Sequence, residues 1–125
     1  MLNIKRHACP VDYRLCNQTV TVYHCNGGSY IRTVYEKRAF LDFRKTQNVD
    51  KTGSKEANSF LLVIPGDTIP VAVGDKVMHG VGPDNITTAA AWASFIPSKV
   101  QGLAVVKYVD PKYWNDQLVH TEAGG

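Results

Sequence analysis

The sequence predicts a mainly β domain, a small SH3-like or OB-like barrel with one short helix. Two of the observations behind this prediction come from the last third of the chain. A Gly-Asp turn opens the strand-like segment Val73–Gly80, and Leu103–Val109 is rich in β-branched residues. The third observation is that the longest apolar run, Phe60–Ile64, has the length of a strand. Together these segments indicate a small closed β-barrel.

A chain of 125 residues fits one domain, because two cores of half this size would each be marginal. We therefore expect residues 1–125 to form a single barrel domain. Hydrophobic residues make up 44% of the chain and charged residues 20%, which argues against wholesale disorder. The start of the chain has no apolar core of signal-peptide length, so we expect synthesis in a cytoplasm and no membrane partner.

The first half of the chain predicts three strands. Gln18–His24 mixes β-branched and aromatic residues in near alternation, which suits a strand with one buried face. Asn26–Gly28 supplies the positive φ angles that a tight hairpin requires, and Ser29–Tyr35 is the return strand. Phe40–Arg44 is a third, short strand.

Thr46–Asn58 is polar and has no apolar periodicity, so it is interpreted as a long exposed loop. Two interpretations of this loop stay open. It is either a connection of no consequence or an arm that reaches a neighbour or the lumen of a ring, since connections this long are usually functional or disordered. In the second case Lys45, Lys51 and Lys55 are the candidate contact residues.

The second half predicts further strands around a helix. Strands are expected at Ser59–Ile64 and Asp75–His79, and alanines favour a helix from Ile86 to about Phe95, which Pro97 stops. On that helix Trp92 is interpreted as a packing residue that meets the barrel.

The last two strands are predicted at Leu103–Val109 and Gln117–Thr121, with residues 110–116 as the loop that joins them. This loop contains Tyr113 and Trp114. Aromatic residues in loops either plug a barrel mouth or anchor a protein interface, and both interpretations stay open here.

The three cysteines are an odd number, which argues against a complete disulfide framework. Cys9, Cys16 and Cys25 could be drawn with His24 as a zinc site, because thiolate and imidazole are ligands that zinc prefers. Their spacing lacks the knuckle of two to four residues that presents two sulfurs to one metal. No metal and no cofactor are therefore predicted.

No catalytic motif stands out, and the sequence predicts that the protein is not an enzyme. Cys25 and His24 are neighbours on a strand, so their side chains point to opposite faces. Four other residues would converge only if their two strands pair: His79 and Asp75 with His120 and Glu122. Neither a phosphate-binding loop nor a complete dinucleotide fingerprint is present.

Charge is distributed unevenly. Residues 1–56 contain ten Lys or Arg against five Asp or Glu, whereas residues 57–125 contain four against six. Such asymmetry suits either nucleic-acid contact or a subunit that stacks its basic face on an acidic face. The candidate DNA-facing residues are Arg32, Lys37, Arg38 and Arg44. A small nucleic-acid-binding barrel is accordingly an alternative function, and a metal-dependent enzyme is a third class.

From about Val20 onward the order of segments resembles that of tailed-phage head-completion proteins, the stopper-like head-to-tail connectors or minor capsid proteins. The resemblance lies in a layout of strands around a polar loop and a short helix: Thr19–Tyr23, Ser29–Tyr35, Leu62–Pro65, Val73–Val77, Val105–Val109 and Leu118–His120. Residues 1–16 depart from this layout and are interpreted as an N-terminal extension that contacts a neighbour.

The resemblance implies a structural virion protein located at the neck. Such subunits form a homo-oligomeric ring below the portal and adaptor, help to retain packaged double-stranded DNA in the channel, and provide the surface to which the tail attaches. Another tail-completion or minor capsid role is the alternative within this class. The resemblance carries over no catalytic residues.

Overall fold

Seven strands form one antiparallel sheet within residues 11–50 and 53–125, the part of the chain that the computed structural model describes. The order of the strands across the sheet is β5-β4-β1-β2-β3-β7-β6. The elements are β1 (Gln18–Asn26), β2 (Ser29–Asp50), β3 (Gly53–Pro65), β4 (Lys76–His79), α1 (Ala89–Ser94), β5 (Leu103–Val105), β6 (Tyr108–Trp114) and β7 (Gln117–Gly124). The prediction of a mainly β fold with one short helix is confirmed.

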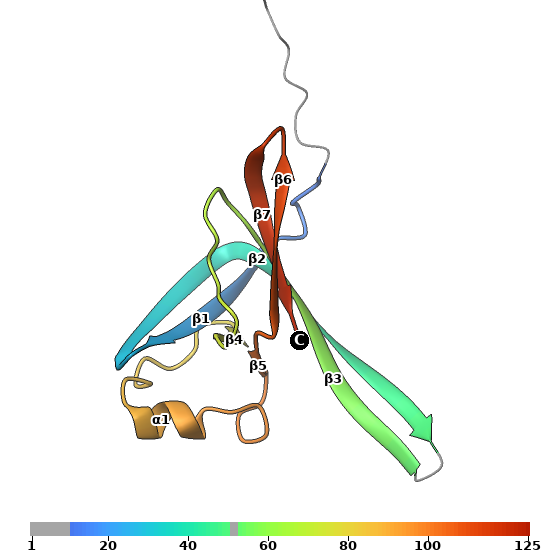
Figure 1. Cartoon of the computed structure of the whole chain (residues 1–125), viewed down its shortest axis with the longest axis vertical. Helices are drawn as coiled ribbons and strands as arrows, with labels where there is room; N and C mark the ends of the chain where they lie inside the picture. The colour runs from blue at the N-terminus through green and yellow to red at the C-terminus, as the bar shows by residue number, and fades with distance from the viewer. Residues whose placement is uncertain (1–10, 51–52) are drawn as a thin grey trace, which may run out of the picture.

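The sheet curls until its two ends meet, which gives a half-barrel (Figure 1). β5 and β6 lie at opposite ends of the sheet, yet only Val106 and Lys107 separate them in the chain. The Val106 N–H donates to the carbonyl of Asp75 at 2.8 Å, and the Lys107 N–H donates to the carbonyl of Gly124 at 2.8 Å. This two-residue link therefore ties the β4 side of the sheet to β7.

β1 is the strand around which the molecule packs. Its Val20 and Val22 belong to the main core inside the curl, whereas Tyr23 belongs to a second cluster on the other face. That second cluster contains Phe95, and Trp92 packs against it, which confirms the predicted packing role of Trp92. The prediction that Gln18–His24 buries one face is wrong, because the segment around α1 covers its second face.

β2 is a single strand where the sequence predicted two. The segments Ser29–Tyr35 and Phe40–Arg44 are joined by a bulge: Val20 pairs with Tyr35, but Gln18 pairs with Ala39. Within the bulge Lys37 has a φ of 54°, a left-handed conformation that few side chains adopt. The bulge bends β2, so that its first part lies on β1 and its last part leads away from the body (Figure 1).

The predicted loop Thr46–Asn58 is instead the end of a long β-hairpin. β2 and β3 stay in register from Phe40 opposite Val63 to Asp50 opposite Gly53. Polar residues make a strand here because they extend a ladder that the buried pairs have already aligned, so the segment needs no apolar face of its own. We call the paired residues 44–50 and 53–59 the hairpin arm; in Figure 1 it projects from the body as a two-stranded ribbon.

The C-terminal third also differs from the prediction. α1 covers only Ala89–Ser94, because the Thr88 hydroxyl accepts a hydrogen bond from the Ala91 N–H at 3.1 Å and caps the helix there. Residues 110–114, predicted as loop, belong to β6, and Asn115 and Asp116 form the turn into β7 with φ angles of 49° and 61°. In the described residues, no helix has the length and apolar character needed to cross a membrane.

Candidate interaction surfaces

Among the described residues, the strands of the hairpin arm pair only with each other. β1 pairs with β2 only as far as Ala39, and β7 pairs with β3 only over Leu61–Pro65. Within the described chain each arm strand therefore has one neighbouring strand, and its outer edge presents backbone groups that a further strand could use. An isolated two-stranded hairpin is marginally stable in water, so an arm of this kind gains stability from a partner.

The arm is rich in cations. Between residues 44 and 58 the sequence has four Lys or Arg and two Asp or Glu. Lys45 and Lys55 belong to the arm strands, and Arg44 stands at the root of the arm, where its guanidinium lies 3.1 Å from the Asp42 carboxylate. Lys51 lies outside the described residues.

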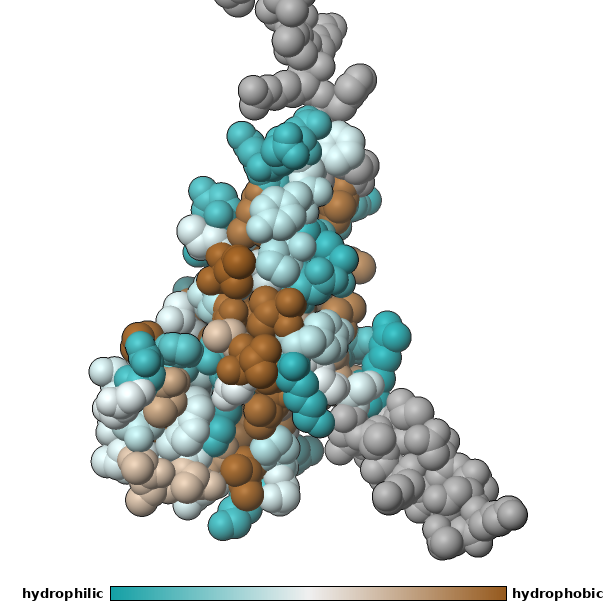
Figure 2. Space-filling model, in the orientation of Figure 1, coloured by the Kyte–Doolittle hydropathy of each residue, from teal (hydrophilic) through white to brown (hydrophobic). Residues whose placement is uncertain are grey.

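An apolar hollow of about 620 Å³ lies at the root of the arm, and we call it the basal groove. One wall is formed by Phe43 and Phe60, whose ring centroids are 6.3 Å apart, and the other by Leu103–Val105 of β5. Phe43 is 44% exposed although it is aromatic. Figure 2 shows an apolar band that runs down this face of the molecule over β6 and β5.

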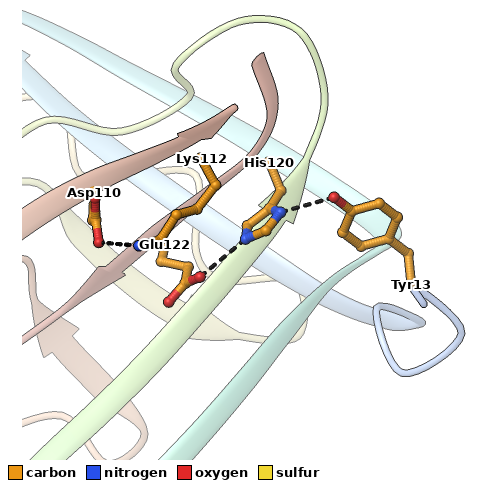
Figure 3. A network of polar contacts seen from close by, with 5 residues as sticks. All are labelled: Tyr13, Asp110, Lys112, His120 and Glu122. Atoms are coloured by element: carbon orange, nitrogen blue, oxygen red, sulfur yellow. Dashed lines mark hydrogen bonds and ion pairs between the residues drawn. The ribbon is translucent and has the colours of Figure 1, made fainter. Parts of the chain in front are cut away.

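A chain of polar contacts covers the outer surface of β6 and β7 (Figure 3). The Tyr13 hydroxyl lies 2.8 Å from Nδ1 of His120, and Nε2 of His120 lies 3.0 Å from the Glu122 carboxylate. Beside them Lys112 and Asp110 form an ion pair at 2.7 Å. Hydrogen bonding to Asp110 raises the pKa of Lys112, and the charge of Glu122 adds to this effect.

This network attaches the N-terminal segment to the sheet. Tyr13 precedes β1, and its ring meets the His120 ring edge-on with centroids 5.4 Å apart. His120 is only 6% exposed. A neutral imidazole that donates from Nε2 to Glu122 can accept from the Tyr13 hydroxyl at Nδ1, so both contacts are compatible with one tautomer. The arrangement is that of a structural clasp.

A second imidazole–carboxylate pair lies at the opposite side of the sheet. His24 Nδ1 is 2.6 Å from the Asp75 carboxylate, which also accepts a hydrogen bond from the Ala72 N–H at 2.9 Å. Such a pair is the orienting half of a catalytic triad, which needs a nucleophile next to the imidazole. The small hollow beside it, about 270 Å³, has Thr33 as the one hydroxyl-bearing residue among its described lining. The predicted lack of enzymatic activity stays a prediction.

Lys76 is buried on the outer face of β4. Its ammonium group donates to the Trp92 carbonyl at 2.5 Å and lies 4.2 Å from the centroid of the Trp92 ring. Burial lowers the pKa of Lys76. The carbonyl and the ring face both favour the charged form of the lysine, so this contact fastens α1 to the sheet.

The four basic residues predicted to face DNA do not form one patch. Arg32 donates to the Gly82 carbonyl at 2.6 Å, which ties β2 to the segment before α1. Lys37 and Arg38 lie in the bulge, where the Arg38 guanidinium is 5.9 Å from the Tyr35 ring centroid. Arg44 is separated from them by the buried positions of β2 and stands at the arm. The side chains thus spread along β2.

Tyr113 and Trp114 lie on β6 and not in a loop. They are consecutive on a strand and so differ in environment: Tyr113 is 62% exposed, whereas Trp114 is half-buried. The indole N–H of Trp114 is buried and has no hydrogen-bond partner among the described residues. The exposure of Tyr113 thus suits a residue that anchors a protein interface, whereas the burial of Trp114 suits a residue that fills the end of the barrel.

The cysteines and the predicted histidine cluster are dispersed. Cys16 lies just before β1 and Cys25 near the end of it, and the strand from Gln18 to Cys25 spans roughly 23 Å, so the two thiols cannot share one metal ion. Burial raises the pKa of the Cys16 thiol, which disfavours the thiolate that a metal requires. Cys9 lies outside the described residues.

β4 pairs with β1 and β5, whereas β7 pairs with β3 and β6, so the strand pairing that would bring His79 and Asp75 to His120 and Glu122 does not occur. In residues 11–50 and 53–125 no three His, Cys, Asp or Glu side chains are placed to hold a metal ion.

Sequence reasoning missed both imidazole–carboxylate pairs. His120 and Glu122 are two residues apart on a strand, so their side chains lie on the same face of the sheet. Their spacing in the sequence was enough to predict this pair. The partners Tyr13 and Asp75 were not predictable, because each comes from a distant segment that only the sheet topology brings near.

One family model matches most of the chain. Residues 15–125 match the family model described as a family of unknown function, DUF6751, and the chain belongs to this family. Neither a curated protein nor a solved structure matches the chain.

Proposed function

We propose that the protein is a structural subunit of a tailed-phage neck, a stopper-like head-to-tail connector. In this role it forms a ring of identical subunits below the portal and adaptor, helps to retain packaged double-stranded DNA, and offers a surface to the tail. Its location is then the virion, after synthesis in the host cytoplasm.

The observation that carries the proposal is the hairpin arm. A small half-barrel with a projecting two-stranded ribbon has a body that can pack against neighbours in a ring and an element that can reach beyond the ring wall. The surplus of Lys and Arg between residues 44 and 58 suits an arm that meets the phosphates of DNA in a channel.

A closed ring requires two different patches of one subunit to meet, because its interface is heterologous. The charge of the chain suits such a contact. The basic half contains β1, β2 and the arm root, whereas Asp110, Asp116 and Glu122 stand on or beside β6 and β7. Subunits related by rotation can thus bring a basic surface of one subunit to an acidic surface of the next.

The principal rival is a small barrel that binds nucleic acid as a monomer. That function favours cations and aromatic residues gathered on one face of the barrel. Arg32 and Arg38 lie apart on β2 and each makes a local contact with its guanidinium, which favours the neck role over this rival.

The test is electron microscopy of the particle whose genome carries this gene, with and without a shortened arm. Because Thr46 pairs with Ala57 at a hydrogen-bonded position of the ladder, replacing residues 47–56 by Asn-Gly keeps the register and closes the hairpin early. We expect the native protein in a ring at the neck, and we expect particles with the shortened arm to keep the ring but lose DNA from the head.

Two results would contradict the proposal. One is a native particle without the protein at its neck. The other is isolated protein that binds DNA tightly at physiological salt and never assembles. A matched control is Lys99→Glu, which changes charge outside the arm and should leave DNA retention as in the native particle.

A further inference from the structure

We infer that the basal groove accepts an extended segment of a partner protein, which adds a strand between β5 and the root of the arm. The partner segment is apolar at alternate positions and carries carboxylates. This inference does not depend on the neck role, since it concerns a strand-binding groove that any partner of this chemistry could use.

The groove lies between two strand edges that have no neighbour in the described chain. β5 is the last strand on its side of the sheet, and Ser59 and the arm residues before it lack a neighbour on the β7 side. Gly125 lies at one end of the groove, between β3 and β5. Its carbonyl accepts from the Phe60 N–H at 3.2 Å, and a Cβ placed on it would lie 2.9 Å from the Val105 carbonyl oxygen.

A strand that continued the line of β7 past Gly125 would therefore run with β3 on one side and β5 on the other. Both edges offer backbone N–H and C=O groups, and pairing with such edges is a common mode of peptide recognition. Main-chain hydrogen bonds then supply much of the affinity, and the groove walls select the side chains.

The walls select for apolar side chains at alternate positions. Leu103 belongs to the second cluster and Ala104 to the main core, so the β5 wall of the groove is apolar on both faces of the strand. Phe43 stands at the rim with much of its ring in solvent. An incoming strand turns every second side chain toward this surface and would cover the Phe43 ring.

The charges select for carboxylates. Arg44 and Lys107 are the charged residues among the described lining of the groove, and both are cationic. Asp42 neutralises Arg44 in part, but it lies outside the lining. A segment with Asp or Glu at its ends therefore matches the rim.

The same features disfavour a second copy of this chain as the occupant. The other edge of the sheet, β6, contains Pro111 and a break in register between Lys112 and Tyr113, two devices that block further pairing. The arm of a second copy has an excess of cations and would face Arg44 and Lys107. We therefore assign the groove to a strand from another protein.

The experiment is a titration of ¹⁵N-labelled full-length protein with a seven-residue capped peptide that alternates valine and threonine and has glutamate at both ends. We expect shift changes along β5 and slower hydrogen exchange at the amides of Leu103, Val105 and Asn58, which by the alternation of each ladder point toward the groove. A peptide with its central valine replaced by proline should bind about tenfold more weakly, because it lacks a ladder donor.

Charge-swap variants test the rim. Arg44→Glu, in a side chain that is 70% exposed, should weaken binding of the glutamate peptide and strengthen binding of a lysine-ended peptide, whereas Lys112→Glu on β6 should change neither. Folding of each variant is checked by its unperturbed amide spectrum. Shift changes confined to β6, equal binding of the proline peptide, or changes that follow protein concentration without peptide would each overturn the inference.

Discussion

At the scale of single residues, Gly82 is where the fold leaves no room for a side chain. A Cβ on Gly82 would lie 2.1 Å from the Tyr23 hydroxyl, which donates to the Pro83 carbonyl at 2.7 Å, and 3.1 Å from the sulfur of Met78. Gly82→Ala should displace the buried Tyr23 and lower the free energy of unfolding by about 1–3 kcal/mol. Chemical denaturation monitored by circular dichroism measures this loss.

The matched control is the same substitution in a Tyr23→Phe background. The hydroxyl that meets the new methyl group is then absent, so most of the penalty of Gly82→Ala should disappear in a double-mutant cycle. An equal penalty in both backgrounds would show that the backbone of residues 80–83, and not the Tyr23 hydroxyl, resists the added carbon.

At the scale of elements, the β6–β7 hairpin turns through two residues that both have positive φ. This is the backbone of a type I′ turn, in which glycine is preferred at the second position. Asp116, with a φ of 61°, is exposed, so Asp116→Gly should raise the free energy of unfolding by about 0.5 kcal/mol, and Asp116→Ala should lower it by about 1 kcal/mol. Thermal unfolding of the two variants beside the native protein decides the order; the reverse order would contradict a type I′ turn.

At the scale of the whole molecule, the link through Val106 and Lys107 joins the two ends of the sheet. The main core and the second cluster around α1 should therefore unfold together. The two tryptophans report on different parts: Trp92 on the layer around α1, and Trp114 on β6. Trp92→Phe and Trp114→Phe proteins, each with one remaining tryptophan, should show fluorescence midpoints that coincide with the circular dichroism midpoint of the same protein. A fluorescence midpoint well separated from the circular dichroism midpoint, in either variant, would mean that the part around the remaining tryptophan unfolds independently.

The sequence allowed some elements to be predicted because their signals are local. The hairpin at Asn26–Gly28 depends on two adjacent glycines with positive φ, and the core strand at Ser59–Ile64 depends on a continuous apolar run. Both were predicted correctly in type and place. The prediction of a single domain stays a prediction, for which the tryptophan experiment is a test.

Other elements could not be predicted because their cause is distant in the sequence. The arm strands have no apolar periodicity and form by extending the pairing of buried residues such as Leu41 and Leu62. Residues 110–114 of β6 were predicted as a loop; they include Pro111, which a strand tolerates here since β6 lies at an edge of the sheet. The basal groove needs β3 and β5 to approach each other, and nothing in either segment signals the other.

The continuity of β2 has a mechanical consequence. From Phe40 to Asp50 at the end of the arm, the strand runs without a register break in its pairing with β3. The described residues thus place no hinge between barrel and arm. A force applied to the outer end of the arm is therefore transmitted along the paired strands to Leu41 and Leu62 in the core of the half-barrel. The arm acts as a lever whose fulcrum is the hydrophobic core.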